Sequence, residues 1–221
     1  MSTETPELGL RARKKQRTRE LIAETARRLF AERGFEAVTV AEIARAAEVA
    51  EKTVFNYFPT KEDLFYSRLE AFEAEILAAI RDREPGESAL AAFGRFLGAP
   101  RGVFALGDAD PAAATEQLHT VTRVVTSSPA LLARERQVLA DYTDSLAALL
   151  AEETGASPHD AEPLVAAHAL IGLHRSLIEL VRRHALAGAD APTVAAALRT
   201  EVDRAIARLE AGLGDYAVRP R

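Results

Sequence analysis

Apolar residues recur along this 221-residue chain at the three- and four-residue spacing of amphipathic helices, and no segment of useful length alternates as a strand does. Gly and Pro fall mostly between the periodic segments. The pattern predicts helices at about 18–33, 39–47 and 51–58, a long fourth helix from Thr60, and further helices at about 87–98, 111–126, 129–153, 158–187 and 191–212. We therefore expect an all-α protein.

The segment 34–59 carries the clearest start and stop signals. Gly34 followed by Phe35 is typical of a helix C-terminus with a hydrophobic contact behind it. The sequence TVAE at 39–42 has the Thr and Glu spacing of a capping box, which opens a helix. A turn at 48–50 leads to a short helix that Pro59 ends. Two short helices joined by a tight turn are the helix-turn-helix arrangement.

The third predicted helix separates its side chains by face. Val54 and Phe58 lie four residues apart and share one side, which we expect to face the core together with Val49 from the turn. The other side carries polar residues with aromatic residues at its flanks: Lys52, Thr53, Asn56, Phe55 and Tyr57. A helix of about two turns with one core side and one polar side suits insertion into a DNA groove.

Residues 39–65, TVAEIARAAEVAEKTVFNYFPTKEDLF, resemble the DNA-binding region of the tetracycline-repressor (TetR) family. The resemblance rests on T-V-x-x-I-A in the second helix, V-x-x-x-T-V-F-x-Y-F around the third and K-E-D-L at the start of the fourth, and it covers roughly residues 14–66. It implies a cytoplasmic homodimer that regulates transcription, most simply as a repressor of a palindromic operator. A small effector would bind its C-terminal domain and release the DNA.

The implied organisation has three parts: a flexible basic N-terminal arm at 1–13, a three-helix helix-turn-helix DNA-binding domain at 14–60, and a C-terminal helical domain at 61–221 for effector binding and dimerisation. Residues 1–60 contain 11 Lys/Arg and 9 Asp/Glu, whereas residues 61–221 contain 17 and 24. The run Arg11–Arg19 holds six cations and no acid. Such a run can follow the DNA backbone or minor groove, or can be only a solvated tail.

Two positions depart from the family pattern. Glu48 occupies the turn position where Gly is frequent, and a non-glycine residue in the left-handed conformation costs about 1 kcal/mol. Ala50 replaces a frequent capping Ser, which costs ~0.5–2 kcal/mol. Glu48 and Glu51 offset part of this loss at the positive helix end. Glu51 meets phosphates unfavourably unless it accepts a hydrogen bond from a cytosine amino group.

Four candidate DNA contacts are suited to phosphates. Lys52 and Lys61 supply cations, and Lys61 also begins the fourth helix, whose N-terminus attracts anions. Tyr57 can donate its hydroxyl to a phosphate, and Thr39 can cap the second helix and donate with the same hydroxyl.

Three further candidates are suited to bases. The Asn56 amide matches adenine N6 and N7 with two hydrogen bonds, which makes it the best base reader. Thr53 and Phe55 suit contact with a thymine methyl group. Any one of these residues alone could equally be a solvated surface residue, and the interpretation depends on the set sharing one face.

The C-terminal segments have more apolar surface than one core needs. The helix at 158–187 carries an arc made of Ala166, Ala167, Ala169, Leu170, Ile171, Leu173, Leu177, Ile178, Leu180 and Val181. An arc this wide requires two partners, its own core and a second surface. The last helix adds Val194, Leu198, Val202, Ala205, Ile206 and Leu209. The TetR resemblance implies that these two helices form a four-helix dimer interface.

Two polar residues interrupt apolar faces: His174 in that arc, and Glu135 on the helix at 129–153. Because buried polar groups usually have a partner, both can be satisfied core or interface groups. The alternative is that they line an effector pocket between helices. The candidate pocket residues are Phe93, Phe96, His119, Glu135, Tyr142 and His174.

Other functional classes lack their signals. The chain has no Cys, no Gly-rich phosphate loop, no H-E-x-x-H and no G-x-S-x-G, and its five His residues show no helical zinc spacing. We expect no metal, no cofactor and no enzymatic activity. The N-terminus lacks a signal-peptide core and no uninterrupted apolar run reaches ~18 residues, so we expect no membrane partner.

Two alternatives without DNA binding stay open: an all-α enzyme and a helical protein-interaction module. A catalytic bundle does not need the polar surface of the third helix, and the basic N-terminal segment argues against the module.

Overall fold

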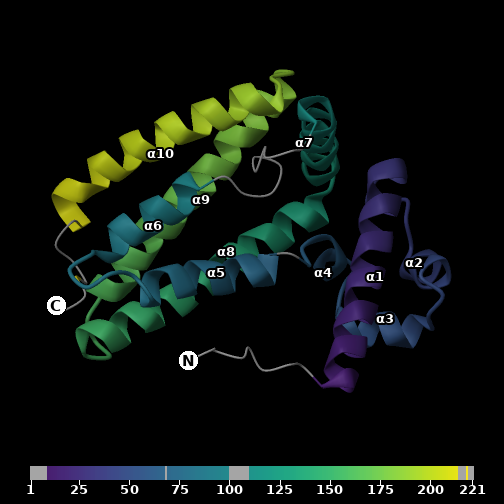
Figure 1. Cartoon of the computed structure of the whole chain (residues 1–221), viewed down its shortest axis with the longest axis horizontal. Helices are drawn as coiled ribbons and strands as arrows, with labels where there is room; N and C mark the ends of the chain where they lie inside the picture. Colours follow the sequence, from purple (N-terminus) through teal and green to yellow (C-terminus); the bar gives the residue numbers. More distant parts are fainter. Residues whose placement is uncertain (1–8, 68, 100–109, 214–217, 219–221) are drawn as a thin grey trace, which may run out of the picture. The chain divides into compact units, whose positions relative to one another are not determined.

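The computed structural model describes residues 9–67, 69–99, 110–213 and 218, which divide between two compact units, 1–68 and 69–221. The helices are α1 (Leu10–Arg33), α2 (Val40–Ala46), α3 (Glu51–Tyr57) and α4 (Lys61–Phe65) in the first unit, and α5 (Leu69–Arg81), α6 (Ala89–Gly98), α7 (Pro111–Thr126), α8 (Pro129–Thr154), α9 (Glu162–Leu186) and α10 (Ala191–Leu213) in the second (Figure 1). The all-α prediction is confirmed.

The first unit is a small helical domain built on α1, which packs against α2 and α4 while α2 packs against α3. Its core consists of fully buried apolar side chains: Ile22, Ala26, Phe30, Phe35, Val38, Ile43, Val54, Phe58 and Leu64. Phe65 extends this core, because its ring lies 6.1 Å from that of Phe30 and 6.3 Å from that of Phe35. Phe58 and Phe65 are therefore structural, whereas 45% of Phe55 is exposed.

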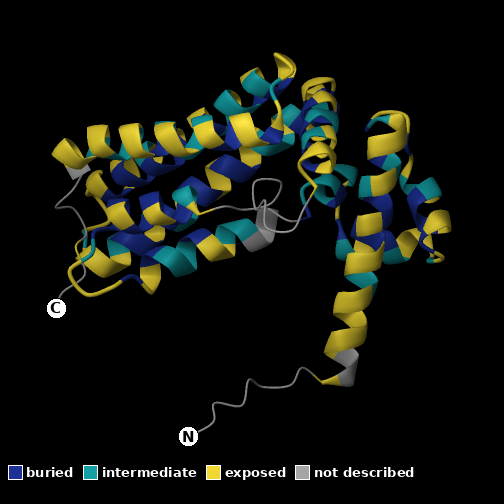
Figure 2. Ribbon diagram, turned by 45° about the horizontal axis from the view of Figure 1, so that its top comes forward, coloured by how far each residue is buried: buried dark blue, intermediate teal, exposed yellow. Residues whose placement is uncertain are grey.

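Helix α1 begins at Leu10, eight residues before the predicted start at Thr18. The basic run is thus helical from its first residue, and the predicted arm at 1–13 is corrected for residues 10–13, while 1–8 lie outside the described residues. Arg, Lys, Gln and Ala are good helix formers, and Gln16 donates a hydrogen bond to Glu20 one turn later. Hydrophobic periodicity could not reveal this segment because all its described side chains from Ala12 to Arg17 are exposed (Figure 2).

The predicted long fourth helix is two helices, since α4 ends at Phe65 and α5 begins at Leu69. Thr60 and Asp63 form a reciprocal capping box that starts α4. Leu64 is fully buried, and the Phe65 ring lies against Tyr66 at 5.0 Å. No Gly or Pro marks the break. It falls where the chain leaves the first unit, so tertiary packing rather than local sequence ends α4.

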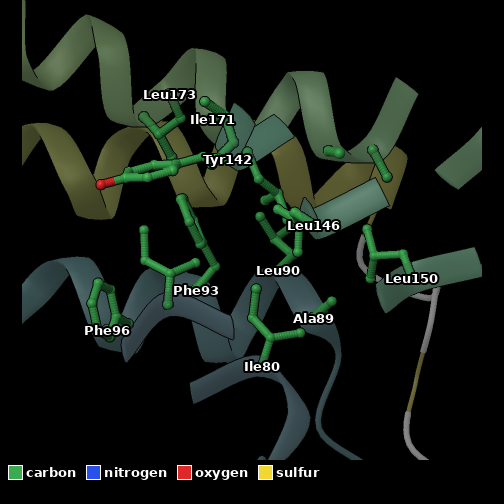
Figure 3. Close-up of a cluster of buried hydrophobic side chains, with 14 of the residues drawn as sticks. Ile80, Ala89, Leu90, Phe93, Phe96, Tyr142, Leu146, Leu150, Ile171 and Leu173 are labelled. Carbon is green, nitrogen blue, oxygen red and sulfur yellow. The ribbon is translucent and has the colours of Figure 1, made fainter. Parts of the chain in front are cut away.

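The second unit is a helical bundle in which α8 packs along α9, and α10 packs along both α6 and α9 (Figure 1). Helices α5 and α7 also contact α8, so the unit has more than one helix layer. Its main core gathers side chains from α5, α6, α8, α9 and α10, among them Ile80, Phe93, Leu146, Leu150 and Leu170 (Figure 3).

A buried ion pair fixes the connection between α5 and α6. Arg83, which is 2% exposed, donates to both carboxylate oxygens of Glu153 on α8, at 3.1 and 2.7 Å. It also donates to the backbone carbonyls of Ile80 and Glu87. A buried cation with this many acceptors is compensated, so the turn after α5 is held to the end of α8.

Helix α9 is the long apolar helix of the second unit. By length and composition it is apolar enough to cross a membrane, although the apolar run is interrupted by single polar residues. In the bundle, its buried apolar residues pack against α8, α10 and α7, whereas Leu164, Val165 and Leu186 are exposed. The helix is the central core helix of the second unit.

Candidate DNA-binding surface and effector cavity

Helix α3 has the two faces that its sequence predicts. Val54 and Phe58 are 0% and 1% exposed and belong to the core of the first unit. Lys52 and Asn56 are exposed on the opposite side, together with Phe55, whereas Thr53 and Tyr57 are half-buried. The backbone N–H of Phe58 closes the helix on the Val54 carbonyl before Pro59 ends it. The helix therefore presents a short polar surface from a rigid base.

The turn between α2 and α3 adopts the conformation that its sequence disfavours. Glu48 has φ of 55°, the left-handed region in which Gly is free of strain, and it is the only described non-glycine residue with positive φ. Ala50 is the N-cap of α3 and provides no side-chain hydrogen bond. Both predicted costs are present, and the packing of Val54 and Phe58 must outweigh them.

Thr39 caps α2 in a complete capping box. Its hydroxyl accepts from Glu42 N–H at 3.2 Å and donates to the Glu42 carboxylate at 2.9 Å. The backbone N–H of Thr39 and the Arg33 guanidinium, 2.9 Å away, also bind this carboxylate and lower the pKa of Glu42 to about 2. The Thr39 hydroxyl hydrogen is thus already directed at a carboxylate, so a phosphate would have to compete for it.

Lys61 is held close to the surface of the domain. Its ammonium lies 4.2 Å from the centroid of the Phe35 ring, a cation–π contact. The first turn of α4 already has acidic neighbours, since Asp63 accepts from Thr60 N–H at 3.0 Å. The charge of Lys61 rather than the end of this five-residue helix is therefore the feature that suits a phosphate.

A groove of about 400 Å³ lies between α1 and α3. Lys15 and Arg19 line it from α1, and Asn56 and Tyr57 line it from α3. The Arg19 guanidinium lies 4.8 Å from the Phe58 ring centroid, which draws this cation toward α3. Lys15 is exposed and has no ion-pair partner among the described residues. Sequence reasoning did not place these two cations beside Asn56, although their four-residue spacing on a helix was a usable signal.

The second unit contains a cavity of about 410 Å³. Most of its wall is apolar and comes from α7 and α9, with Leu118, Val121, Val125, Leu177, Ile178 and Val181 among the lining residues. Helices α5, α6 and α10 supply the remaining wall. Part of the wide apolar arc of α9, namely Leu177, Ile178 and Val181, faces this cavity.

His174 is the one predicted pocket residue in the wall of this cavity. Its ring is stacked on Phe72, with 5.0 Å between the centroids and 28° between the planes. Neither ring nitrogen has a hydrogen-bond partner among the described residues. Burial among apolar groups lowers the pKa of His174 to about 4, so the imidazole is neutral at pH 7.

Glu135 lies next to the cavity wall rather than in it. Both of its carboxylate oxygens accept from the guanidinium of Arg182, one of them at 2.9 Å, and Arg182 itself lines the cavity. Glu179 lies 3.6 Å from the same guanidinium. The two polar residues that interrupt the apolar faces thus have different environments, because Glu135 is paired and His174 is not.

The other predicted pocket residues are placed elsewhere. Phe93, Phe96 and Tyr142 are 0%, 4% and 3% exposed, and all three belong to the main core of the second unit (Figure 3). His119 Nε2 donates to the backbone carbonyl of Ala189 at 2.9 Å, and the residue lies at a separate polar groove. This hydrogen bond gives His119 a structural role. None of the four residues lines the cavity.

Cavity residues that sequence reasoning missed include Phe72, Thr122 and Arg199. Each lies on a different helix, and a helical wheel treats helices one at a time. The usable signal in the sequence was the wide apolar arc of α9. It indicated that α9 faces a second surface besides the core, but not which residues of other helices form that surface.

Comparison with protein families agrees with this division. Residues 22–67 match the model described as bacterial regulatory proteins of the tetR family, and residues 100–214 match the MftR C-terminal domain. The first range lies within the helical domain that carries α3, and the second covers much of the unit that contains the cavity.

Individual relatives are similar over most of the chain. The HTH-type transcriptional regulator TcmR of Streptomyces glaucescens is 34% identical over 154 residues, which are 69% of this chain and 67% of TcmR. The proposed mycofactocin biosynthesis transcriptional regulator MftR of Mycobacterium tuberculosis is 26% identical over 174 residues, covering 76% of this chain and 81% of MftR.

A solved structure shows the same fold. It is that of native NalD, the secondary repressor of the MexAB-OprM multidrug efflux pump in Pseudomonas aeruginosa, with a TM-score of 0.54, 21% identity, and coverage of 87% of this chain and 96% of NalD. Together with the family matches, these similarities establish that the chain belongs to the TetR family, whose members are DNA-binding transcriptional regulators rather than enzymes.

Proposed function

We propose that the protein binds a palindromic operator as a homodimer in the cytoplasm and represses transcription from it. The observation that carries this proposal is the convergence of Asn56 on α3 with Lys15 and Arg19 on α1 at one groove. A base-reading amide beside two cations is the combination that sequence-specific binding requires, since cations position the protein on the phosphates and the amide reads a base edge.

The roles of individual side chains follow from their exposure. Asn56 is exposed at the end of α3 and contacts adenine in the major groove, with Phe55 and the half-buried Thr53 against a thymine methyl. The phosphate contacts are Lys52, Tyr57 and Lys61, with Lys15 added from α1 and with Thr39 at the start of α2. This set places phosphate contacts on all four helices of the first unit.

The proposed dimer contact is the outward face of α9. Leu164 and Val165 are 44% and 60% exposed near its N-terminus, and Leu186 is 64% exposed at its other end. A Cβ atom at Gly172 would meet nothing within 4 Å, so a second helix can approach closely there. By contrast, the outward face of α10 is rich in charge, with Arg204 and Arg208 exposed. The α9 face is the more apolar candidate for a symmetric contact.

An operator selection followed by a gel-shift titration tests this proposal. Selection from a pool of random duplexes should return a palindrome whose half-sites lie ~34–36 Å apart or a multiple of this spacing. One dimer should bind each palindrome. Tight binding of one monomer to a single half-site would contradict the proposed mode of recognition.

A matched pair of variants tests the dimer contact. Val165→Glu should convert the protein to a monomer in sedimentation and weaken operator binding, because it places a charge in an apolar interface. Ala148→Glu adds the same charge on the exposed face of α8, outside the two proposed interface helices, and should change neither property. Equal behaviour of the two variants would contradict the assignment to α9.

We further propose that a small molecule in the α7–α9 cavity releases the DNA. A pocket of about 410 Å³ with mostly apolar walls and few polar groups has the character of a ligand site. An effector alters operator binding only if it binds the two conformations of the protein with different affinities, and such couplings usually amount to about 5–150-fold.

A further inference from the structure

The cavity that we propose as the effector site carries information about the chemistry of its ligand. One part of its wall is aromatic, because the Phe72 and His174 rings stack on each other beside the aliphatic side chains of α7 and α9. A ligand that fills this space must be largely apolar, since polar surface placed against these walls would lose its hydrogen bonds to water.

The wall contains few polar groups, and these differ in the hydrogen bonds that they can form with a ligand. His174 has two ring nitrogens without a hydrogen-bond partner among the described residues. The neutral imidazole offers one N–H donor and one acceptor, because the apolar surroundings hold its pKa at about 4. Thr122, 5% exposed, adds a hydroxyl without a partner among the described residues. The wall therefore offers hydrogen bonds at few points, and at one of them His174 can both donate and accept.

The charges around the cavity do not favour a charged ligand. Arg182 lines the wall, but Glu135 accepts from two of its nitrogens and Glu179 lies 3.6 Å away, so its charge is compensated. Arg199 also lines the cavity, but it is exposed, and water and salt weaken the attraction of an exposed cation. No uncompensated buried charge is present among the described lining residues.

We propose that the effector is an uncharged, largely apolar molecule with one hydroxyl or carbonyl group. His174 hydrogen-bonds that group, and Phe72 orients the imidazole ring by stacking on it. This inference rests on the proposed effector role of the cavity and adds the chemical class of the ligand. It treats His174 as a ligand contact rather than as a structural residue.

The charge preference can be measured with two fluorescent probes that share one skeleton. N-phenyl-1-naphthylamine is neutral, and 8-anilino-1-naphthalenesulfonate differs from it by one sulfonate. The neutral probe should bind the full-length protein at least about tenfold more tightly, since of the described lining cations Arg182 is paired and Arg199 is exposed to solvent. Val121→Trp, at a half-exposed position of the wall, should fill the cavity and abolish binding while the melting temperature is retained.

The possible outcomes separate the ligand class from the effector site. If the sulfonate probe bound more tightly than the neutral probe, and Arg199→Gln removed that binding, the ligand class would be overturned. The cavity would still be the effector site. Failure of both probes to bind, or binding that Val121→Trp does not affect, would overturn both proposals. Operator binding is measured separately by gel-shift and does not depend on either result.

The role of His174 needs its own comparison. 4-Hydroxybiphenyl and biphenyl, each measured by displacement of the neutral probe, differ by one hydroxyl. The ratio of their affinities should fall about three- to tenfold in His174→Phe, the range expected of one hydrogen bond. His174→Gln keeps a donor and an acceptor and should retain most of the ratio. Phe72→Leu should weaken both ligands alike. An unchanged ratio in both His174 variants would overturn the assignment.

Discussion

At the residue scale, the molecule places two polar side chains on apolar helix faces and treats them differently. Glu135 meets Arg182, which compensates its charge. His174 stacks on the ring of Phe72, and its two nitrogens have no hydrogen-bond partner among the described residues. His174 is half-buried at the wall of a cavity, where a ligand can supply the missing partner.

Burial of a neutral His174 predicts how stability depends on pH. Its pKa is about 4 in the folded protein and 6.5 in the unfolded chain, so below pH 6.5 the unfolded state takes up a proton first. Stability should therefore fall as pH drops from 6.5 toward 4. Between pH 7 and pH 5 the wild type should lose about 2 kcal/mol more than His174→Phe. Urea denaturation at equal protein concentration measures this difference, and equal losses would contradict the desolvated state of His174.

Glu48 offers a second prediction at this scale. Its φ of 55° is strained for any residue with a Cβ atom. Glu48→Gly should raise the free energy of unfolding by about 0.5–1 kcal/mol. The matched control is Glu48→Ala, which removes the same carboxylate and keeps the strain, so it should bring no such gain. Thermal unfolding distinguishes the two variants, and equal melting temperatures would argue against stored strain in this turn.

At the scale of helices, the Arg182–Glu135 pair ties α9 to α8 beside the cavity. The two side chains are 11% and 12% exposed, so loss of one charge leaves the other poorly solvated. Glu135→Gln should destabilise the second unit by about 2–4 kcal/mol, with Glu179 compensating part of the loss. The exposed Arg204–Glu201 pair is the control, since Glu201→Gln should cost less than about 1 kcal/mol. Comparable losses in chemical denaturation would show that burial is not the cause.

The helices also show how far sequence alone could predict the structure. The two faces of α3, the capping box at Thr39 and the strained turn at Glu48 were all predictable, because each depends on residues close in sequence. The start of α1 was not, since an exposed basic helix has no apolar period. The break between α4 and α5 was missed for a different reason, because the packing of Leu64 and Phe65 into the first unit causes it.

The cavity was the least predictable feature. Phe93 and Tyr142 are apolar or amphipathic residues on buried faces, which is equally compatible with a pocket wall and with a filled core. The structure assigns them to the core because side chains from α5, α6, α8 and α9 meet there. His174 was identified from its own surroundings in the sequence, but Phe72, its stacking partner, comes from a helix about a hundred residues away.

At the scale of the whole molecule, the chain separates DNA recognition from ligand recognition. The first unit contains the groove with Asn56, and the second contains the cavity with His174. The charge distribution follows this division, since Lys and Arg outnumber acids only in the first sixty residues. A regulator of net charge −5 can therefore bind DNA, because the proposed attraction to phosphates acts locally, at the cations of the groove. The salt dependence of the DNA affinity measures this attraction.

The measurement that tests this account most directly is fluorescence anisotropy of the selected operator and a scrambled duplex, each titrated at several salt concentrations. Asn56→Ala should reduce the free-energy preference for the operator over the scrambled duplex by ~1–3 kcal/mol. The slope of log affinity against log salt should stay unchanged. Lys15→Ala should weaken both duplexes alike and flatten that slope by about 1. If Asn56→Ala preserved the ratio and Lys15→Ala preserved the slope, the groove between α1 and α3 would not be the DNA-binding site.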